Sequence, residues 1–333
     1  MINKTENKVM ENWKSSSDKP LVSMCCITFN HEKFISTALD SLLMQETDFS
    51  FEIIIRDDYS TDNTRNIIQS YAEKFPHIIT TILEIENQYS KGINPFIPAY
   101  EKAKGKYVTI LEGDDYWRDK LKLQKQVDFL EKNSEYVLSY HNSIIVDKNN
   151  TLISEKKNPS ACDYTKEEML CGEVFILTNT VMFRNVDNVT ADQLNGILNA
   201  DTVLWHLLGY HGKSKYQEEI EYAAYRYHDG GVWSSLDNIE KFKNTIKTMN
   251  TLKNMLPEHY NKLKKRIETN INRGVFNLLY KSISVLDFKA FISIIKLIAN
   301  SKNLTFLKVF FSIPSFFIEK IRHQYLKLKI KKI

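Results

Sequence analysis

The amino-acid sequence predicts an α/β fold in which helices flank a mixed, mainly parallel sheet, followed by an α-helical C-terminal region. Short apolar runs of strand type alternate with segments of helical periodicity between residues 21 and 132. That alternation is typical of parallel sheets that are covered by helices on both faces. Three of the runs also end in Asn or in clustered acids, at the strand ends where such sheets place their sites.

The expected elements follow one another in a regular order. Apolar runs predict early strands at residues 21–29, 51–55, 78–83 and 107–111. Helical spacing of apolar residues predicts the intervening and following helices at 34–43, 64–74, 94–103 and 121–132. Later strands are expected at 136–146, 174–184 and 220–227, and later helices at 166–170 and 198–208.

Composition and charge bound the organisation of the chain. Its 333 residues, 43% of them hydrophobic, suffice for one large domain with an appendage. We expect a flexible segment at 1–19, a main domain at 20–235 and a helical, basic region at 236–333. Residues 288–333 carry ten Lys/Arg and one acid, whereas the remainder of the chain is mildly acidic. This distribution argues against a general nucleic-acid binder and suggests that the tail is attracted to an anionic surface.

The N-terminal residues and the cysteines favour a cytoplasmic protein. Residues 1–20 are polar and lack the apolar centre of a signal peptide. Cys25 and Cys26 are adjacent in an expected strand, and Cys162 and Cys171 lie nine residues apart without a zinc-ligand spacing. We therefore expect reduced thiols.

An acid-rich turn after the strand at 107–111 is the most informative stretch. Glu112, Asp114 and Asp115 surround Gly113, and clustered carboxylates require a positive partner when they are withdrawn from water. A plain polar turn is the alternative interpretation. Two other strands also end in polar residues, Asn30 and the pair at 57–58. Because the carboxyl ends of parallel strands meet at one edge, this convergence favours a site for Mn²⁺ or Mg²⁺.

Three motifs in this order resemble family 2 glycosyltransferases. They are PLVSMCCITFNHEKF from Pro20, FEIIIRDDYSTDNT from Phe51, and GKYVTILEGDDYW from Gly105, the last followed by KLQKQVDFLE. The resemblance extends from residue 19 to about residue 233 and implies a GT-A fold. It also implies an inverting enzyme that uses a nucleotide-sugar donor, most frequently a UDP-sugar.

The resemblance assigns several residues to the donor. Those implied to bind the nucleotide are Thr28, Phe29, Asn30, Asp57, Asp58 and Gly92. Those implied at the diphosphate end are Glu112, Gly113, Asp114, Asp115 and His228. Asp114 is the principal implied metal ligand, with Glu112 and His228 as further ligands. The chain departs from the family pattern at Glu112, where Asp is usual, and after Gly92, where the diphosphate-binding segment of many relatives is replaced.

The acid that the resemblance implies as general base is Asp201. Transfer with inversion needs a cation at the leaving diphosphate and one carboxylate to take the acceptor proton. Structural roles remain open as alternatives: Asp201, Asp57 and Asp58 could serve as helix-terminal acids, and His228 could be a core histidine. We assign Asp62 to helix capping, and the side chains assigned to packing or structure are Trp117, Trp233, His31 and His206.

The C-terminal residues 288–333 alternate apolar clusters with Lys. They form either a helical subdomain that packs on itself or a basic amphipathic surface that lies on an anionic bilayer. The second interpretation suits a saccharide or lipid-linked saccharide acceptor in bacterial surface-glycan assembly, with the enzyme peripheral at the inner face of the membrane. Two alternative functions are a sugar nucleotidyltransferase, against which the glycine-free FNHEKF segment argues, and an inactive nucleotide-sugar-binding module.

Overall fold

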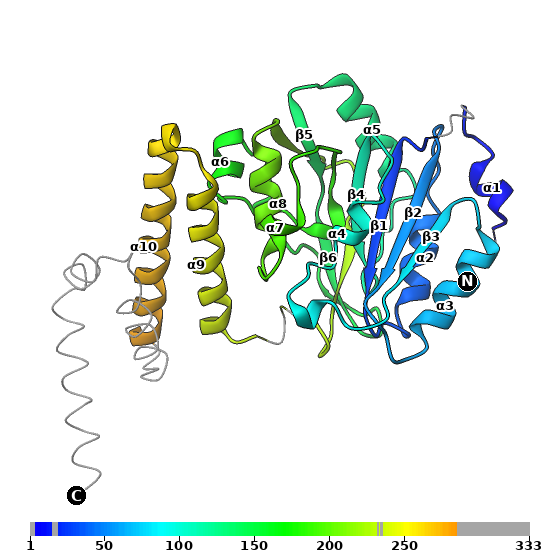
Figure 1. Cartoon of the computed structure of the whole chain (residues 1–333), viewed down its shortest axis with the longest axis horizontal. Coiled ribbons are helices and arrows are strands. Elements are labelled where there is room, and N and C mark those ends of the chain that lie inside the picture. The colour runs from blue at the N-terminus through cyan, green and yellow to red at the C-terminus, as the bar shows by residue number, and fades with distance from the viewer. Residues whose placement is uncertain (1–3, 15–18, 232, 234–235, 285–333) are drawn as a thin grey trace, which may run out of the picture. The chain divides into compact units, whose positions relative to one another are not determined.

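The computed structural model describes residues 4–14, 19–231, 233 and 236–284 (Figure 1). The chain divides into two compact units, residues 1–235 and 236–333, and each is described by itself. The basic segment 288–333, with its expected membrane contact, lies outside the described residues.

A seven-stranded sheet forms the centre of the first unit. Its strands are β1 (Val22–Thr28), β2 (Phe51–Asp57), β3 (Ile79–Leu83), β4 (Tyr107–Glu112), β5 (Tyr136–Tyr140), β8 (Met182–Arg184) and β9 (Lys213–Tyr216). They are ordered β3-β2-β1-β4-β8-β5-β9. Strands β1 to β4 run parallel, and β8 is antiparallel to both β4 and β5. The prediction of a mixed, mainly parallel sheet is therefore confirmed.

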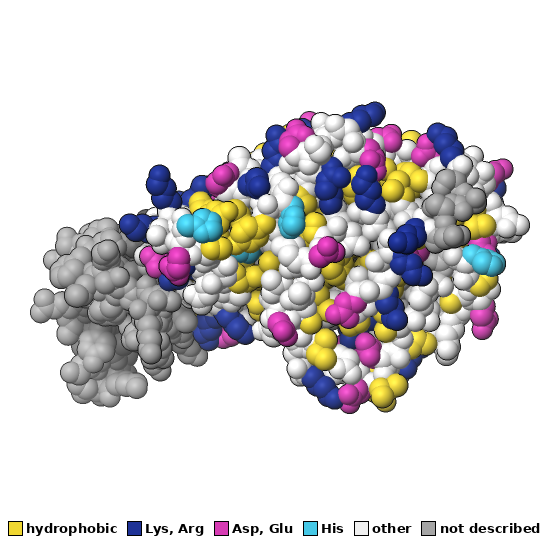
Figure 2. Space-filling model, turned by 45° about the horizontal axis from the view of Figure 1, so that its top comes forward, with side chains coloured by type: hydrophobic (Ala, Val, Ile, Leu, Met, Phe, Trp, Pro, Cys, Tyr) yellow, Lys and Arg dark blue, Asp and Glu magenta, His cyan; other side chains and the backbone are white. Residues whose placement is uncertain are grey.

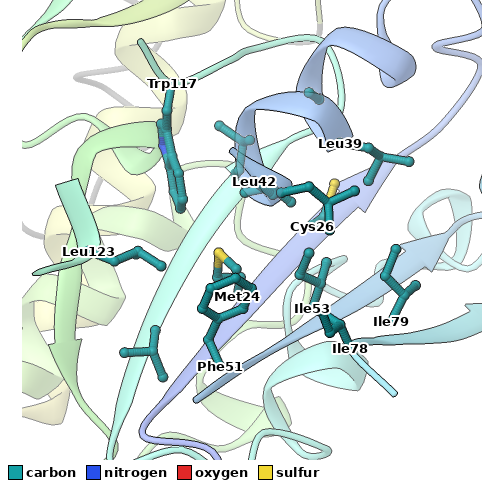
Figure 3. Packing of buried hydrophobic residues seen from close by; sticks show 14 of the residues in the cluster. Met24, Cys26, Leu39, Leu42, Phe51, Ile53, Ile78, Ile79, Trp117 and Leu123 are labelled. Carbon is teal, nitrogen blue, oxygen red and sulfur yellow. The ribbon is translucent and has the colours of Figure 1, made fainter. Parts of the chain in front are cut away.

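Helices cover both faces of this sheet. On one face, α2 (Ile35–Leu43), α3 (Thr64–Lys74) and α5 (Lys122–Lys132) pack on apolar side chains of β1 and β2. Figure 3 shows the packing there, with Met24, Phe51 and Ile53 around the middle of the view and Trp117 at its upper left. On the other face, the short helix α4 (Ile97–Tyr100) contacts β1 and β2. Three further helices follow later in this unit, namely α6 (Lys166–Leu170), α7 (Ala191–Leu194) and α8 (Ala200–Gly209).

A second sheet of three strands was not predicted as such. It contains β10 (Ala223–Tyr227), β6 (Ser143–Asp147) and β7 (Leu152–Ser154), in the order β10-β6-β7. The predicted strand 136–146 is broken at residues 141–142, where the buried Asn142 amide bonds the backbone of Asn158, and its halves enter different sheets. The predicted strand 174–184 is likewise reduced to β8, which follows the 3₁₀ turn η2 (Thr178–Thr180).

A short helix, which the sequence did not predict, lies within the segment 1–19 that we expect to be flexible. Thr5 caps the short helix α1 (Glu6–Met10) by accepting a hydrogen bond from the Lys8 amide. Val9 of α1 is buried, and the Trp13 ring packs edge-on against Phe51 with 5.1 Å between ring centroids. These apolar contacts hold a helix that is too short to be stable by itself.

The described part of the second unit is a helical hairpin. It consists of α9 (Asn238–Met255), the 3₁₀ turn η3 (Glu258–Tyr260) and α10 (Asn261–Ser284). Asp237 begins α9 by accepting hydrogen bonds from the Ile239 and Glu240 amides. Among the described residues, no helix is both long and apolar enough to cross a membrane. On the face seen in Figure 2, basic and acidic side chains are intermingled over the described surface.

Candidate functional site

The carboxyl ends of β1, β2 and β4 meet at one edge of the sheet. Thr28 lies opposite Asp57 in the β1–β2 pairing, and Ile27 lies opposite Glu112 in the β1–β4 pairing. The Gly113 amide then donates to the Ile27 carbonyl at 2.8 Å. The polar residues that follow the three strands are thus brought together, as the sequence predicts.

Two histidines and one carboxylate form a compact group at this edge. His228 Nε2 lies 2.9 Å from Asp114 Oδ2, and His31 Nε2 lies 3.8 Å from the same oxygen. The three potential ligand atoms all lie within 4.8 Å of one another. His31, which we assigned to structure, therefore belongs to the group, and its place in the Asn30-His31-Glu32 break after β1 was the available signal.

Neighbouring side chains orient this group and shift the pKa values of its members. Thr28 Oγ1 lies 3.1 Å from His31 Nδ1, which directs Nε2 of the same ring towards Asp114. Burial lowers the pKa of His31, against the opposing effect of the Asp114 charge. Burial alone would raise the pKa of Asp114, but His31 and His228 bring it below its usual value. Its Oδ1 atom is buried and has no hydrogen-bond partner within the described residues.

Gly113 is required by close packing at this turn. A Cβ atom there would lie 2.7 Å from Thr28 Oγ1 and 2.8 Å from Thr28 Cβ. We expect Gly113→Ala to lower the free energy of unfolding by about 1–3 kcal/mol through overpacking. It should also displace His31, whose Nδ1 would lie 3.0 Å from the new atom.

Chemical denaturation and Mn²⁺ titration of purified variants would test this expectation. Gly274→Ala is a control, because the Cβ there meets only the Phe242 ring, at 3.1 Å. That variant should bind Mn²⁺ as the wild type does. Unchanged stability and Mn²⁺ affinity in Gly113→Ala would contradict the packing argument.

Glu112 lies beside the histidine–aspartate group without belonging to it. Its Oε2 atom is buried and has no partner within the described residues. Burial, reinforced by the negative charge of Asp114, raises the pKa of Glu112 to about 8. The charge of Asp201 acts on the pKa of Glu112 in the same direction, with a smaller effect. Glu112 is the last residue of β4 and begins the acid-rich turn.

Asp115 is satisfied by the protein itself. Its Oδ1 atom accepts from the Arg226 amide and its Oδ2 atom from Asn179 Nδ2, both at 2.8 Å. Burial, followed by the charges of Asp114 and Glu112, raises the pKa of Asp115 well above its usual value. Asp115 therefore connects the turn after β4 to β10 and η2.

The acidic pair at the end of β2 is buried, and its two members differ. Asp58 is engaged on both oxygens, by Arg56 and the Gln88 amide on Oδ1 and by the Tyr89 amide on Oδ2. Asp57 Oδ2 accepts from Arg65 Nε at 2.7 Å, whereas Asp57 Oδ1 is buried without a partner within the described residues. Of the pair, Asp57 is therefore the one that keeps an oxygen without a hydrogen bond among the described residues.

Aromatic side chains are exposed near the same strand ends. Phe29 and Tyr59 follow β1 and β2, and both are more than two-fifths exposed. Tyr59 has a positive φ of 66°, which is uncommon for a bulky residue. Asn30, with φ of 54°, accepts from the Thr61 amide at 2.8 Å and so joins the two loops. The sequence pattern did not single out Tyr59.

Asp201 and Gly92 lie on segments that border this edge. Asp201 is in the first turn of α8, and its Oδ1 atom accepts from the Thr202 amide at 2.7 Å. Burial raises the pKa of Asp201, which brings it closer to the range suited to a general base. Gly92 has φ of 84°, and its carbonyl accepts from the Gly196 amide at 2.7 Å. The loop after β3 thus contacts the segment that leads into α8.

Residues 23–188 match the family model described as glycosyl transferase family 2. Through this domain, the chain belongs to glycosyl transferase family 2. The match spans β1 to β8, and it therefore includes the strand ends that carry Thr28, Asp57 and Asp114.

Curated relatives of this family 2 domain come from several bacteria. An uncharacterized protein of Mycobacterium tuberculosis is 33% identical over 223 residues, which cover 64% of this chain and 61% of the relative. The chain thus spans less than two thirds of the length of that relative. Escherichia coli WfaP is 29% identical, and the match covers 71% of this chain and 86% of WfaP. Its name is UDP-Glc:alpha-D-GlcNAc-diphosphoundecaprenol beta-1,3-glucosyltransferase.

Solved structures support the fold. S. aureus TarS residues 1–349, solved with UDP-GlcNAc, has a TM-score of 0.61 and 19% identity, covering 86% of this chain and 81% of TarS. The mannosyltransferase PcManGT of Pyrobaculum calidifontis, solved with GDP-Man and Mn²⁺, has a TM-score of 0.53 and 13% identity, with coverages of 88% and 79%. The predicted GT-A type of fold is thereby confirmed.

Proposed function

We propose that the protein is an inverting glycosyltransferase that moves a sugar from a nucleotide-sugar donor to a hydroxyl acceptor. The observation that carries this proposal is the group of His31, Asp114 and His228 at the strand ends of a family 2 domain. It lies at the same sheet edge as the buried Asp57, whose Oδ1 atom lacks a partner in the described part of the chain.

The three side chains fit a divalent cation. Their ligand atoms are mutually close, and Asp114 Oδ1 is buried without a hydrogen bond in the described structure. Two imidazoles with one carboxylate suit a transition ion such as Mn²⁺ better than Mg²⁺, which prefers oxygen ligands. The bound cation would act as a Lewis acid that stabilises the charge on the leaving diphosphate. Glu112 is outside this group, so we propose Asp114, His31 and His228 as the ligands.

Asp201 is the proposed general base. It would accept the proton of the attacking acceptor hydroxyl, while the glycosidic bond of the donor breaks on the opposite side of the sugar. A single displacement of this kind inverts the anomeric centre without a covalent enzyme intermediate. The electrostatic effect of Asp201 on the buried Glu112 supports a base on the side of the acid-rich turn.

Several contacts support a nucleotide beside Asp57. The free Oδ1 atom of Asp57 would accept an N–H of the base or a ribose hydroxyl, while Asp58 and Asn30 hold the surrounding loops. The exposed Phe29 and Tyr59 rings are suited to stacking on a base. WfaP carries UDP-Glc in its name and TarS was solved with UDP-GlcNAc, so we propose UDP as the nucleotide.

The acceptor is proposed to be a saccharide or lipid-linked saccharide of a bacterial surface glycan. The acceptor in the name of WfaP, a sugar on diphosphoundecaprenol, supports this class. In this proposal, residues 20–235 form the transferase domain, and the basic region 236–333 contacts the inner face of the membrane.

Donor hydrolysis would test the proposed reaction. The purified protein should release UDP slowly from a UDP-sugar when Mn²⁺ is present, and chelation by EDTA should stop the release. A panel of UDP-, GDP- and dTDP-sugars would identify the donor. Absence of nucleoside diphosphate release from every sugar in the panel, with acceptor extracts supplied, would contradict the proposal.

A further inference from the structure

Arg226 lies behind the histidine–aspartate group rather than in it. It is a residue of β10, two positions before His228, and only 3% of it is exposed. Its Nε atom donates to the Asp114 carbonyl at 2.8 Å, and its backbone amide donates to Asp115 Oδ1 at the same distance. One residue therefore holds the turn after β4 at two successive positions.

The other end of the guanidinium holds the turn between β6 and β7. Nη1 donates to Asn150 Oδ1 at 2.7 Å and to the Asp147 carbonyl at 3.3 Å. That turn is itself closed by the Asp147 carboxylate, which accepts from the amides of Asn149 and Thr151 at 2.8 Å each. The guanidinium thus spans a fixed turn of the small sheet and the backbone of a proposed metal ligand.

Phe34 connects Arg226 to the second proposed ligand. The guanidinium carbon of Arg226 lies 4.7 Å from the centroid of the Phe34 ring, and the His228 ring lies 5.0 Å from the same centroid. Phe34 directly precedes α2, and its amide donates to the His31 carbonyl. Displacement of Arg226 would therefore shift the Asp114 backbone directly, and it would shift both histidines through Phe34.

Arg226 forms no ion pair with any described carboxylate, although it is buried. A buried charge without a partner is costly, so carbonyl dipoles, an amide oxygen and aromatic faces must stabilise it. Lys would keep the charge but would lack the planar fork that reaches Asp114 and Asn150 at once. These contacts require arginine geometry and not only a positive charge.

We infer that Arg226 is a positioning residue that fixes the Asp114 backbone and the Phe34 ring, and thereby sets the spacing of Asp114, His31 and His228 for a divalent cation. This inference rests on the cation site of the proposed function, but not on transfer itself. In this inference, the β6–β7 turn anchors the guanidinium of Arg226 and so supports the cation site.

A titration of the full chain with Mn²⁺, with and without UDP, would test the inference. Binding is measured as loss of the electron paramagnetic resonance signal of the free ion. We expect Arg226→Lys to weaken Mn²⁺ binding about 10–100-fold, the loss found when supporting residues of metal ligands are replaced. Asn150→Gly, which tolerates the positive φ of 66° at that position, should weaken binding in the same direction but less.

Arg184→Lys provides the matched control. Arg184 also donates to backbone carbonyls, those of Tyr136, Leu130 and Asn133, and lies over the Tyr107 ring, but it pairs with the amino end of β4. Its replacement should lower the melting temperature and leave Mn²⁺ affinity unchanged. A merely structural Arg226 would behave in the same way.

The inference is overturned if Arg226→Lys binds Mn²⁺ as tightly as the wild type, or if the wild type does not bind Mn²⁺ even with UDP. Wild-type protein that binds Mn²⁺ in an Arg226-dependent manner but releases no nucleoside diphosphate from any sugar would contradict the proposed function alone.

Discussion

Replacing Asp114 by Asn is expected to reduce metal-dependent donor cleavage by at least about a hundredfold, the loss that follows removal of one preorganised electrostatic group. The substitution removes the negative charge that lies within reach of both His31 and His228. It also preserves the size of the side chain, so the turn after β4 should still form. UDP release from the donor at saturating Mn²⁺ is the measurement.

Asp62→Asn is the control for this variant. Asp62 is an acid of the neighbouring loop, and its oxygens accept from the Thr64 amide at the start of α3 and from the Glu32 amide. The N-cap position of α3 is held by Asn63, so Asp62 lies one residue before it. Its replacement should change stability by about 1 kcal/mol or less and leave UDP release near the wild-type rate. Full activity of Asp114→Asn would exclude this carboxylate as a metal ligand.

Replacing Asp201 by Asn is expected to lower kcat for sugar transfer by about 10²–10⁴, the usual contribution of a general base. Donor and Mn²⁺ affinities should remain close to those of the wild type, because Asp201 is not part of the histidine–aspartate group. Single-turnover transfer to a saccharide acceptor would separate the chemical step from binding.

Asp192→Asn distinguishes this loss from a general effect of charge near α8. Asp192 is an exposed acid in the first turn of α7, a helix that contacts α8. It should transfer sugar at the wild-type rate. Equal activity of Asp201→Asn and Asp192→Asn would leave Asp201 with only the helix-terminal role that the sequence analysis kept open.

The parallel strands β1, β2 and β4 could be predicted because each is a continuous apolar run that is recognisable from its own residues. The runs that became β1, β2 and β4 are continuous and apolar, and their polar ends must meet once the strands are parallel. The strands that follow α5 could not be predicted in the same way, because they divide between two sheets. The run 136–146 reads as one strand, and only the pairing of Asn142 with Asn158 turns the chain between two sheets.

In the candidate site, too, some residues could be predicted from local sequence and others depend on contacts that form only in the folded chain. Asp114 and His228 follow from motifs, but His31 enters the group only through the register of β1 against β4 and the contact of its ring with Thr28. The helix at residues 6–10 was missed because its stability comes from the burial of Val9 and Trp13 on distant parts of the chain. Arg226 carries no motif signal, since its importance depends on three segments that meet only in the folded protein.

Calorimetric titration of UDP into the full chain, with and without Mn²⁺, asks whether the strand ends form a metal-dependent nucleotide-diphosphate site. We expect Mn²⁺ to tighten UDP binding at least about tenfold, a coupling of about 1.4 kcal/mol, and Asp114→Asn to abolish the difference. The absence of UDP, GDP and dTDP binding under both conditions, or a UDP affinity that does not change with Mn²⁺, would contradict the site described above.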